Sequence, residues 1–287
     1  MKHPIPSPQI LSSSIHKFFQ QSGTWQAMQD QVAIEEPLEI RATFGPEQAR
    51  LSKNLSITMR TPGHDEELAL GFLIGEGLVQ KRSDLIWQQT KAKPGLACAN
   101  VVNVAFAPDF AFDFAKLERH FYATSSCGVC GKSSIAAIRA RTSFAGSLQD
   151  EELRLSVQQV HGLTQRLLAE QTDFTKTGGL HATGLFDEHG SLLLVREDVG
   201  RHNAFDKVIG ASFKNAVFPL YRTIVVVSGR ASFELVQKAA LAGIPIFIAI
   251  GAPSSLAVAL AKEAGMTLIG FTRPERFNVY HGEWRLR

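Results

Sequence analysis

The pattern of hydrophobic and polar residues is most regular in the carboxy-terminal half of the chain. Short apolar runs at residues 223–227, 244–250 and 267–271 contain mainly Val, Ile, Leu and Phe, which is typical of strands buried on both faces. Between these runs, apolar residues recur with the spacing of a helix. The alternation predicts a parallel sheet whose faces are covered by helices. Helices are expected over residues 155–171, 204–213, 232–241 and 254–264.

Two further strands are expected before the parallel strands, as a hairpin. Residues 179–186 and 192–196 form its strands and residues 187–190 its turn. The resulting order of helix, two strands, and then helix and strand repeated resembles the cytidine-deaminase-like architecture. Zinc deaminases hold their metal with histidine and cysteine motifs at two helix starts. The corresponding turns here, residues 197–203 and 228–232, contain no cysteine, so we expect no catalytic zinc.

The amino-terminal half has a mixed pattern. Strands are expected within residues 32–44, 55–59 and 102–106. Thr61 and Pro62 predict a helix start, with threonine as the cap and proline at the first helical position. The acidic residues at 65–67 suit the positive end of that helix. Gly75 and Gly77 predict its end.

These patterns predict an α/β protein of two domains with α+β character. The carboxy-terminal domain, residues 151–287, is expected to be a cytidine-deaminase-like three-layer domain without zinc ligands. A smaller mixed α/β domain is expected over residues 26–121. Residues 1–25 are expected to be a flexible amino-terminal segment with a loosely ordered start, and residues 122–150 a cysteine-containing loop and linker.

Composition narrows the classes of partner. The chain has 287 residues, 45% of them hydrophobic, and a net charge of +3, which is too mild to argue for nucleic acid but suits a small anionic ligand. No apolar run approaches the length of a membrane span, and the first residues do not resemble a signal peptide. The three cysteines are too few for a disulfide framework and favour the reducing cytoplasm.

Three turns between predicted strands and helices carry residues suited to an anion: residues 198–203, 228–232 and 252–255. Helix starts present unpaired N–H groups and a positive dipole, which attract phosphate. In an open parallel sheet such turns meet at the carboxyl ends of the strands. Arg201 and Arg230 add charge with bidentate geometry. The pattern favours a nucleotide or pyrophosphate ligand, although helix capping is an alternative explanation for each turn.

Ionisable residues near these turns have two interpretations each. His181 and His202 are candidates for acid–base groups or ligands, and a structural role beside a strand or a helix cap is the alternative. Asp198, Arg201 and Asp206 either form an internal ion-pair network or contribute to ligand contact.

The segment 124–132 (TSSCGVCGK) holds two of the three cysteines, Cys127 and Cys130. Structural zinc normally requires four ligands, and the remaining cysteine, Cys98, has no partner near it in the sequence. A thioredoxin-like motif is expected early in a βαβ unit, whereas this pair precedes the α/β pattern. We therefore favour a thiol that carries sulfur, with Lys132 and a following helix raising its thiolate fraction. Inert buried cysteines are the plain alternative.

At this point the sequence resembles the FdhD/NarQ family of formate dehydrogenase accessory sulfur carriers. The resemblance extends from about residue 30 to the end of the chain, and the combined motifs are specific although the single ones are not. The matching segments are 36–38 (EPL), 61–63 (TPG), 76–77 (EG), 125–131 (SSCGVCG), 178–181 (GGLH), 197–203 (EDVGRHN), 206–207 (DK), 228–232 (SGRAS) and 270–271 (GF).

The resemblance implies a function that the residues alone do not. Family members accept sulfur from a cysteine desulfurase as a persulfide and pass it to the bis-molybdopterin guanine dinucleotide form of the molybdenum cofactor, which then enters formate dehydrogenase. The family's persulfide cysteine corresponds to Cys127 and the supporting cysteine to Cys130. A homodimer without a metal of its own is implied. The candidate cofactor-binding residues are Phe271, Thr272, Arg273, Pro274, Glu275, Arg276, Ser228, Gly229, Arg230, Arg201 and His202.

Two other functions remain open from the sequence. A dithiol oxidoreductase would use a Cys127–Cys130 disulfide as its working state. A non-catalytic chaperone would only hold the molybdenum cofactor and the enzyme together. The chemistry of the two thiols distinguishes these possibilities from a sulfurtransferase.

Overall fold

The computed structural model describes residues 9–87, 91–92, 100–110 and 153–287. Its largest sheet has six strands in the order β12-β11-β10-β9-β7-β8. Strands β9, β10 and β11 are parallel, whereas β7, β8 and β12 run antiparallel to their neighbours. The strands are β7 (His181–Asp187), β8 (Leu192–Asp198), β9 (Thr223–Val227), β10 (Ile246–Ala249), β11 (Thr267–Arg273) and β12 (Arg276–His281).

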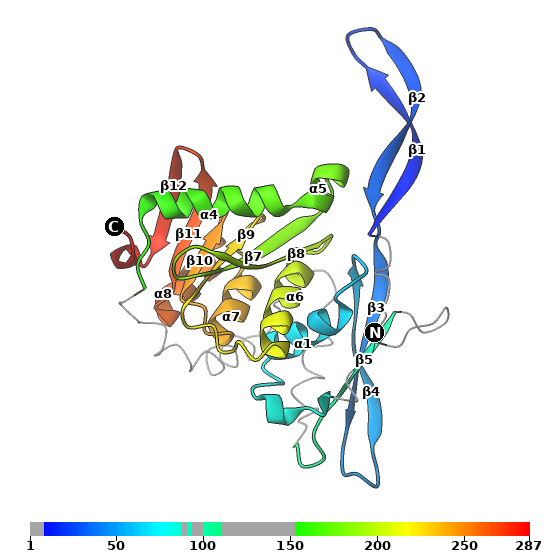
Figure 1. Cartoon of the computed structure of the whole chain (residues 1–287), viewed down its shortest axis with the longest axis vertical. Helices are drawn as coiled ribbons and strands as arrows, with labels where there is room; N and C mark the ends of the chain where they lie inside the picture. The colour runs from blue at the N-terminus through cyan, green and yellow to red at the C-terminus, as the bar shows by residue number, and fades with distance from the viewer. Residues whose placement is uncertain (1–8, 88–90, 93–99, 111–152) are drawn as a thin grey trace.

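Helices cover both faces of this sheet (Figure 1). Helix α4 (Val157–Glu170), continued by the short α5 (Thr172–Thr177), packs on one face, and α6 (Arg201–Lys214), α7 (Phe233–Leu241) and α8 (Ser255–Ala264) lie on the other. Along β9, Ile224 joins the core beneath α4, whereas Val225 joins the core beneath the other three helices. The prediction of strands buried on both faces is therefore confirmed.

The helix starts in this half follow the sequence closely. Ser232 and Ser254 cap α7 and α8, and their hydroxyls accept hydrogen bonds from the N–H groups of Leu235 and Ala257. The expected hairpin is present as β7 and β8. Strand β12 is not among the strands expected from the sequence, where its first residue, Arg276, is a candidate cofactor-binding residue. The mixed α/β class is confirmed, and the cytidine-deaminase-like layout stays a prediction.

A second sheet of four strands, in the order β4-β3-β6-β5, forms the amino-terminal part. Its strands are β3 (Glu36–Phe44), β4 (Leu51–Arg60), β5 (Lys91–Ala92) and β6 (Val101–Ala105). Helix α1 (Asp65–Gly75) follows β4, and single turns lie at η1 (Arg82–Asp84) and η4 (Glu283–Arg285). The expected strands are confirmed, and so is the helix end at Gly75.

The expected start of α1 is wrong. The helix begins at Asp65 with His64 as its cap, in a left-handed conformation (φ 58°), so Thr61 and Pro62 precede it. Thr61 is buried, and its hydroxyl accepts a hydrogen bond from the N–H of Val199, 3.1 Å away. This tertiary contact uses the hydroxyl that the local sequence pattern assigns to capping.

Helices α1 and α6 join the two parts of the molecule at a very close crossing. A Cβ atom on Gly71 would lie 1.8 Å from the backbone oxygen of Asp206, and one on Gly210 would lie 1.8 Å from that of Glu67. Only glycine permits backbones to approach so closely. One hydrophobic cluster includes Leu38 of β3 and Phe247 of β10, so the two sheets share a core. The expected linker, residues 122–150, lies outside the described residues.

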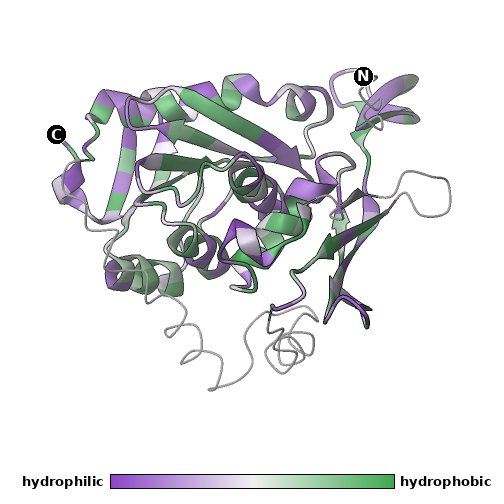
Figure 2. Ribbon diagram, turned by 60° about the horizontal axis from the view of Figure 1, so that its bottom comes forward, coloured by the Kyte–Doolittle hydropathy of each residue, from purple (hydrophilic) through white to green (hydrophobic). Residues whose placement is uncertain are grey.

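A two-stranded arm extends from this body (Figure 1). The arm consists of β1 (Ile10–Phe19) and β2 (Thr24–Ala33), which pair antiparallel along their whole length. Residues 10–19 were expected to belong to a loosely ordered start, and they form a strand instead. The arm exposes large apolar side chains, including Trp25 at 67% and Leu11 at 57%. Figure 2 shows hydrophobic and hydrophilic residues interleaved along it.

The lengths of the helices bear on membrane association. Within the part of the chain that the structure describes, no helix combines the length and hydrophobicity needed to cross a bilayer.

Candidate functional site

Backbone hydrogen bonds join the turns that follow the three parallel strands. The N–H of Gly251 donates to the carbonyl of Gly229 at 2.9 Å, and the N–H of Phe271 donates to the carbonyl of Gly251 at 3.0 Å. These bonds bring two predicted binding segments, 228–232 and the start of 271–276, to one edge of the sheet. We call the following set the strand-end cluster: His181, Arg201, His202, residues 228–232, Gly251 and residues 271–273.

Arg201 and His202 enter the strand-end cluster from the first turn of α6. The cap of this helix is Gly200, which offers no side-chain acceptor, unlike the serine caps of α7 and α8. The Nε atom of Arg201 is buried and has no hydrogen-bond partner among the described residues. A buried donor without a partner is unusual. Arg230 is exposed, and the described residues offer it no hydrogen bond or ion pair.

His181 and Arg201 flank the turn at Gly229. A Cβ atom on Gly229 would lie 3.4 Å from Nδ1 of His181 and 3.8 Å from Cδ of Arg201. These are ordinary van der Waals distances, so both side chains lie directly beside the turn. Ser228 contributes differently, because its hydroxyl accepts a hydrogen bond from the N–H of Ala182 at 2.9 Å. Ser228 thus joins β7 to the turn.

Both histidines of the strand-end cluster are held neutral near pH 7. Burial lowers the pKa of His181, and the charge of Arg201 lowers it further. Burial, followed by the charges of Lys238 and Arg201, lowers the pKa of His202 to about 4. The Nε2 atom of His202 lies 3.3 Å from the hydroxyl oxygen of Ser232. Neutral imidazoles are suited to hydrogen bonding with a ligand rather than to pairing with its charge.

Residues 271–276 differ in burial and in hydrogen bonding. Phe271 has a left-handed backbone (φ 53°) and an exposed side chain. Thr272 is buried, and its hydroxyl donates to the carbonyl of Ala249 at 3.0 Å. Arg273 lies beside them, and its Nη1 donates to the backbone carbonyls of Ile250 and Thr272 at 2.9 Å. Pro274, Glu275 and Arg276 are exposed at the turn between β11 and β12.

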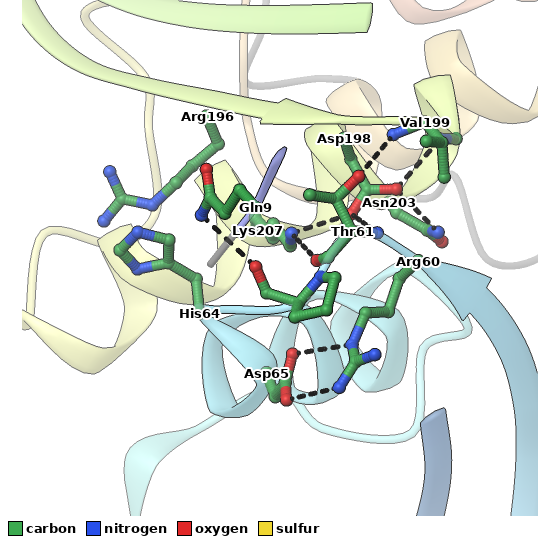
Figure 3. Close-up of polar contacts among 12 residues, drawn as sticks. Gln9, Arg60, Thr61, His64, Asp65, Arg196, Asp198, Val199, Asn203 and Lys207 are labelled. Carbon is green, nitrogen blue, oxygen red and sulfur yellow. Dashed lines mark hydrogen bonds and ion pairs between the residues drawn. The ribbon is translucent and has the colours of Figure 1, made fainter. Parts of the chain in front are cut away.

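A buried ion pair lies behind the first turn of α6 (Figure 3). The Nζ atom of Lys207 is 2.7 Å from Oδ2 of Asp198, and both side chains are fully buried. Lys207 also donates to the carbonyl of Thr61 at 2.8 Å. Asp198 accepts hydrogen bonds from the N–H groups of Thr61 and Gly200 and from the side chain of Asn203. The pair therefore joins the amino-terminal sheet to the helix start that carries Arg201.

The expected network of Asp198, Arg201 and Asp206 is wrong in its pairing. Asp198 pairs with Lys207, and Asp206 pairs with Lys238 at 2.6 Å; Arg201 joins neither. Burial raises the pKa of Asp206 to about 6, and Lys238 opposes this shift. The two lysines were missed as partners. The available signal was their position on the apolar faces of α6 and α7, where an unpaired lysine is costly.

The cysteines lie elsewhere in the chain. Cys98, Cys127 and Cys130 are outside the described residues, so the expected roles of Cys127 and Cys130 stay predictions. Within residues 9–87, 91–92, 100–110 and 153–287, no three His, Cys, Asp or Glu side chains come together as a metal site would require.

Comparison with known proteins shows relatives along nearly the whole chain. The model of the FdhD/NarQ family matches residues 34–287. A sulfur carrier protein FdhD from Streptomyces avermitilis is 48% identical over 261 residues, covering 90% of this chain and 89% of the relative. Another, from Thermoplasma volcanium, is 41% identical over 261 residues, or 90% of each chain.

A solved structure is also similar. The crystal structure described as a formate dehydrogenase accessory protein from Desulfotalea psychrophila superposes with a TM-score of 0.70 at 26% sequence identity. The match covers 98% of this chain and 100% of that one.

Proposed function

Because this chain belongs to the FdhD/NarQ family, we propose that it is a sulfurtransferase serving formate dehydrogenase. It takes sulfur from a cysteine desulfurase as a persulfide on Cys127 and passes it to the bis-molybdopterin guanine dinucleotide form of the molybdenum cofactor. Cys130 supports the first thiol. The names of the relatives, sulfur carrier protein and formate dehydrogenase accessory protein, support this proposal. A reactive thiol and a low cysteine count suit the cytoplasm.

The loading step is an ordinary exchange between sulfur atoms. The thiolate of Cys127 attacks the terminal sulfur of the donor's persulfide. A new S–S bond forms on Cys127, the S–S bond of the donor breaks, and the donor leaves as a thiolate. The protonation of the transferred sulfur is unchanged, and no outside oxidant or reductant is required.

The unpaired Arg201 is the observation that carries the proposed cofactor site. Its buried Nε lacks a partner among the described residues, and it lies at a helix start without a side-chain cap. An arginine beside a helix N-terminus is a favourable environment for a phosphate group. Arg230 supplies a second charge, and the exposed ring of Phe271 offers a flat apolar face for a ring system. The hydroxyl of Thr272 is already bonded to the carbonyl of Ala249. Thr272 therefore holds the backbone of the strand-end cluster in place.

Guanosine monophosphate tests this site as a fragment of the cofactor. We expect Arg201→Ala and Arg230→Ala each to weaken its binding about tenfold or more, because hydrogen bonds to charged groups contribute about 1.5–3 kcal/mol. Arg154→Ala provides the control, since Arg154 is exposed and lies outside the strand-end cluster. Titration calorimetry measures the affinities. Unchanged affinity in both variants would remove the strand-end cluster as the cofactor site.

We further propose that the protein acts as a homodimer and that the arm contributes to the interface. Exposed apolar residues lie on both faces of the arm, among them Leu11 on one face and Trp25 on the other. An isolated two-stranded hairpin has little stability of its own. The only charged side chains of the arm are Lys17 and Asp30. An almost uncharged surface fits a second copy of itself, because a two-fold axis brings like residues together.

Mutation of the arm tests the dimer. Phe18 and Trp25 contact each other near its tip, with tilted rings whose centroids are 5.0 Å apart. We expect the Phe18→Ser, Trp25→Ser double variant to shift the molar mass measured by light scattering from dimer toward monomer. Leu193→Ser is the matched control, because Leu193 is 50% exposed on β8. A monomeric wild-type protein, or a double variant with wild-type mass, would refute the role of the arm.

A further inference from the structure

One acidic side chain stands among the cationic groups near the strand-end cluster. Glu234 lies in the first turn of α7, and its Oε2 is 4.0 Å from Nε2 of His202. The Glu234 side chain is 42% exposed. Among the described residues no lysine or arginine forms an ion pair with it. The carboxylate is therefore available to a ligand that approaches His202.

His202, the neighbour of Glu234, does not form a charged pair with its carboxylate. Burial and the charges of Lys238 and Arg201 lower the pKa of His202, so His202 is neutral near pH 7. Ser232 is engaged as well, since its hydroxyl accepts the N–H of Leu235 and contacts His202. An ionised carboxylate accepts hydrogen bonds and donates none. Glu234 thus presents two acceptor oxygens beside a surface that otherwise favours anions.

A carboxylate in this place weakens the binding of any phosphate nearby, by simple repulsion. The dipole of α7 favours an acidic residue in the first turn, which explains its tolerance but not a function. A ligand that carries an anionic part and a part rich in N–H donors would make use of both charges. Guanine has two adjacent donors, the ring N1–H and the exocyclic amino group. Adenine has only one donor on the same edge, next to a ring nitrogen with a lone pair.

We propose that Glu234 selects guanine by accepting hydrogen bonds from N1–H and the amino group of the base. The inference rests on the proposed function, which supplies a guanine dinucleotide as ligand, and it assigns the choice of base to one side chain. The lone pair of adenine would face the carboxylate and be repelled. Discrimination of this kind is strong where a site is built to accept hydrogen bonds that the competing ligand lacks.

Three nucleotides and one conservative substitution test the assignment. Calorimetry measures the affinities of GMP, IMP and AMP for the wild-type protein and for Glu234→Gln. IMP keeps N1–H but lacks the amino group. We expect the wild type to bind GMP best, IMP less well and AMP least. In Glu234→Gln, the affinity for GMP falls about tenfold and its advantage over AMP is largely lost. Glu47→Gln, at an exposed turn far from the strand-end cluster, keeps the wild-type order.

The direction in which Glu234→Gln changes the nucleotide affinities distinguishes selection of guanine from repulsion of phosphate. If Glu234 only repels phosphate, Glu234→Gln binds GMP and AMP more tightly by the same factor, and the inference is overturned. If the wild type prefers GMP and the variant keeps that preference, the assignment to Glu234 fails while the proposed function stands. A wild-type protein that binds AMP as well as GMP, or binds neither, overturns the assignment to Glu234 together with the strand-end cluster as the cofactor site.

Discussion

Formate dehydrogenase matured in cells whose only copy of this protein is Cys127→Ala is expected to be inactive. Without this thiol no persulfide forms on the carrier, so the cofactor receives no sulfur. We expect formate dehydrogenase activity to fall to the level of a strain that lacks the protein altogether. The measurement is formate oxidation in extracts with equal amounts of the dehydrogenase.

Two further cysteine variants make this experiment specific. Cys98→Ala should leave the activity near the wild-type level, because Cys98 is outside the motif at 124–132. Cys130→Ala should give reduced activity, because a second thiol stabilises or discharges the first but does not carry the sulfur. Full activity with Cys127→Ala would rule out the proposed carrier.

Removal of the lysine from the buried pair is expected to have the largest effect on stability. In Lys207→Met, Asp198 keeps a charge in a fully buried position without its partner. Breaking a buried pair in this way lowers the free energy of unfolding by about 3–5 kcal/mol. Chemical denaturation followed by circular dichroism measures the change. A decrease below about 1 kcal/mol would contradict the structural role of this buried pair.

Two comparisons isolate the buried charge. Lys214→Met breaks a pair with Glu66 of similar length, 2.6 Å, but both of its side chains are partly exposed. Exposed pairs contribute about 0–1 kcal/mol, so this variant should be nearly as stable as the wild type. The double variant Asp198→Asn, Lys207→Met leaves no buried charge at this position. It should recover part of the loss, because the Asn203 and Gly200 contacts require only an oxygen acceptor.

Much of the carboxy-terminal half is predictable from the sequence. Runs such as 223–227 can be satisfied only in the interior, since four of their five residues are apolar and a surface strand alternates with polar residues. Ser232 and Ser254 mark the helix starts within one residue, because capping is a contact between neighbours in the sequence. The strand-end cluster follows from this local information and from the rule that parallel strands end at one edge.

The features that sequence analysis missed depend on contacts between distant residues. Thr61 resembles a helix cap, but its hydroxyl is bonded to the N–H of Val199, which is far away in the sequence. The network expected among Asp198, Arg201 and Asp206 does not form, because Lys207, on the buried face of the same helix as Arg201, pairs with Asp198 instead. The arm has no regular alternation of apolar and polar residues to indicate a strand. No local sequence pattern indicates the contact of Thr61 with Val199 or the pairing of Asp198 with Lys207.

The central claim is that Cys127 carries sulfur, and intact-protein mass spectrometry tests it most directly. The protein is incubated with a cysteine desulfurase and cysteine, then analysed before and after treatment with a reductant. We predict a mass gain of one sulfur atom, located on the peptide that contains Cys127, removed by the reductant and absent from Cys127→Ala. Loss of two hydrogens without added sulfur would indicate a dithiol oxidoreductase, and an unchanged mass a chaperone; either result would contradict the account.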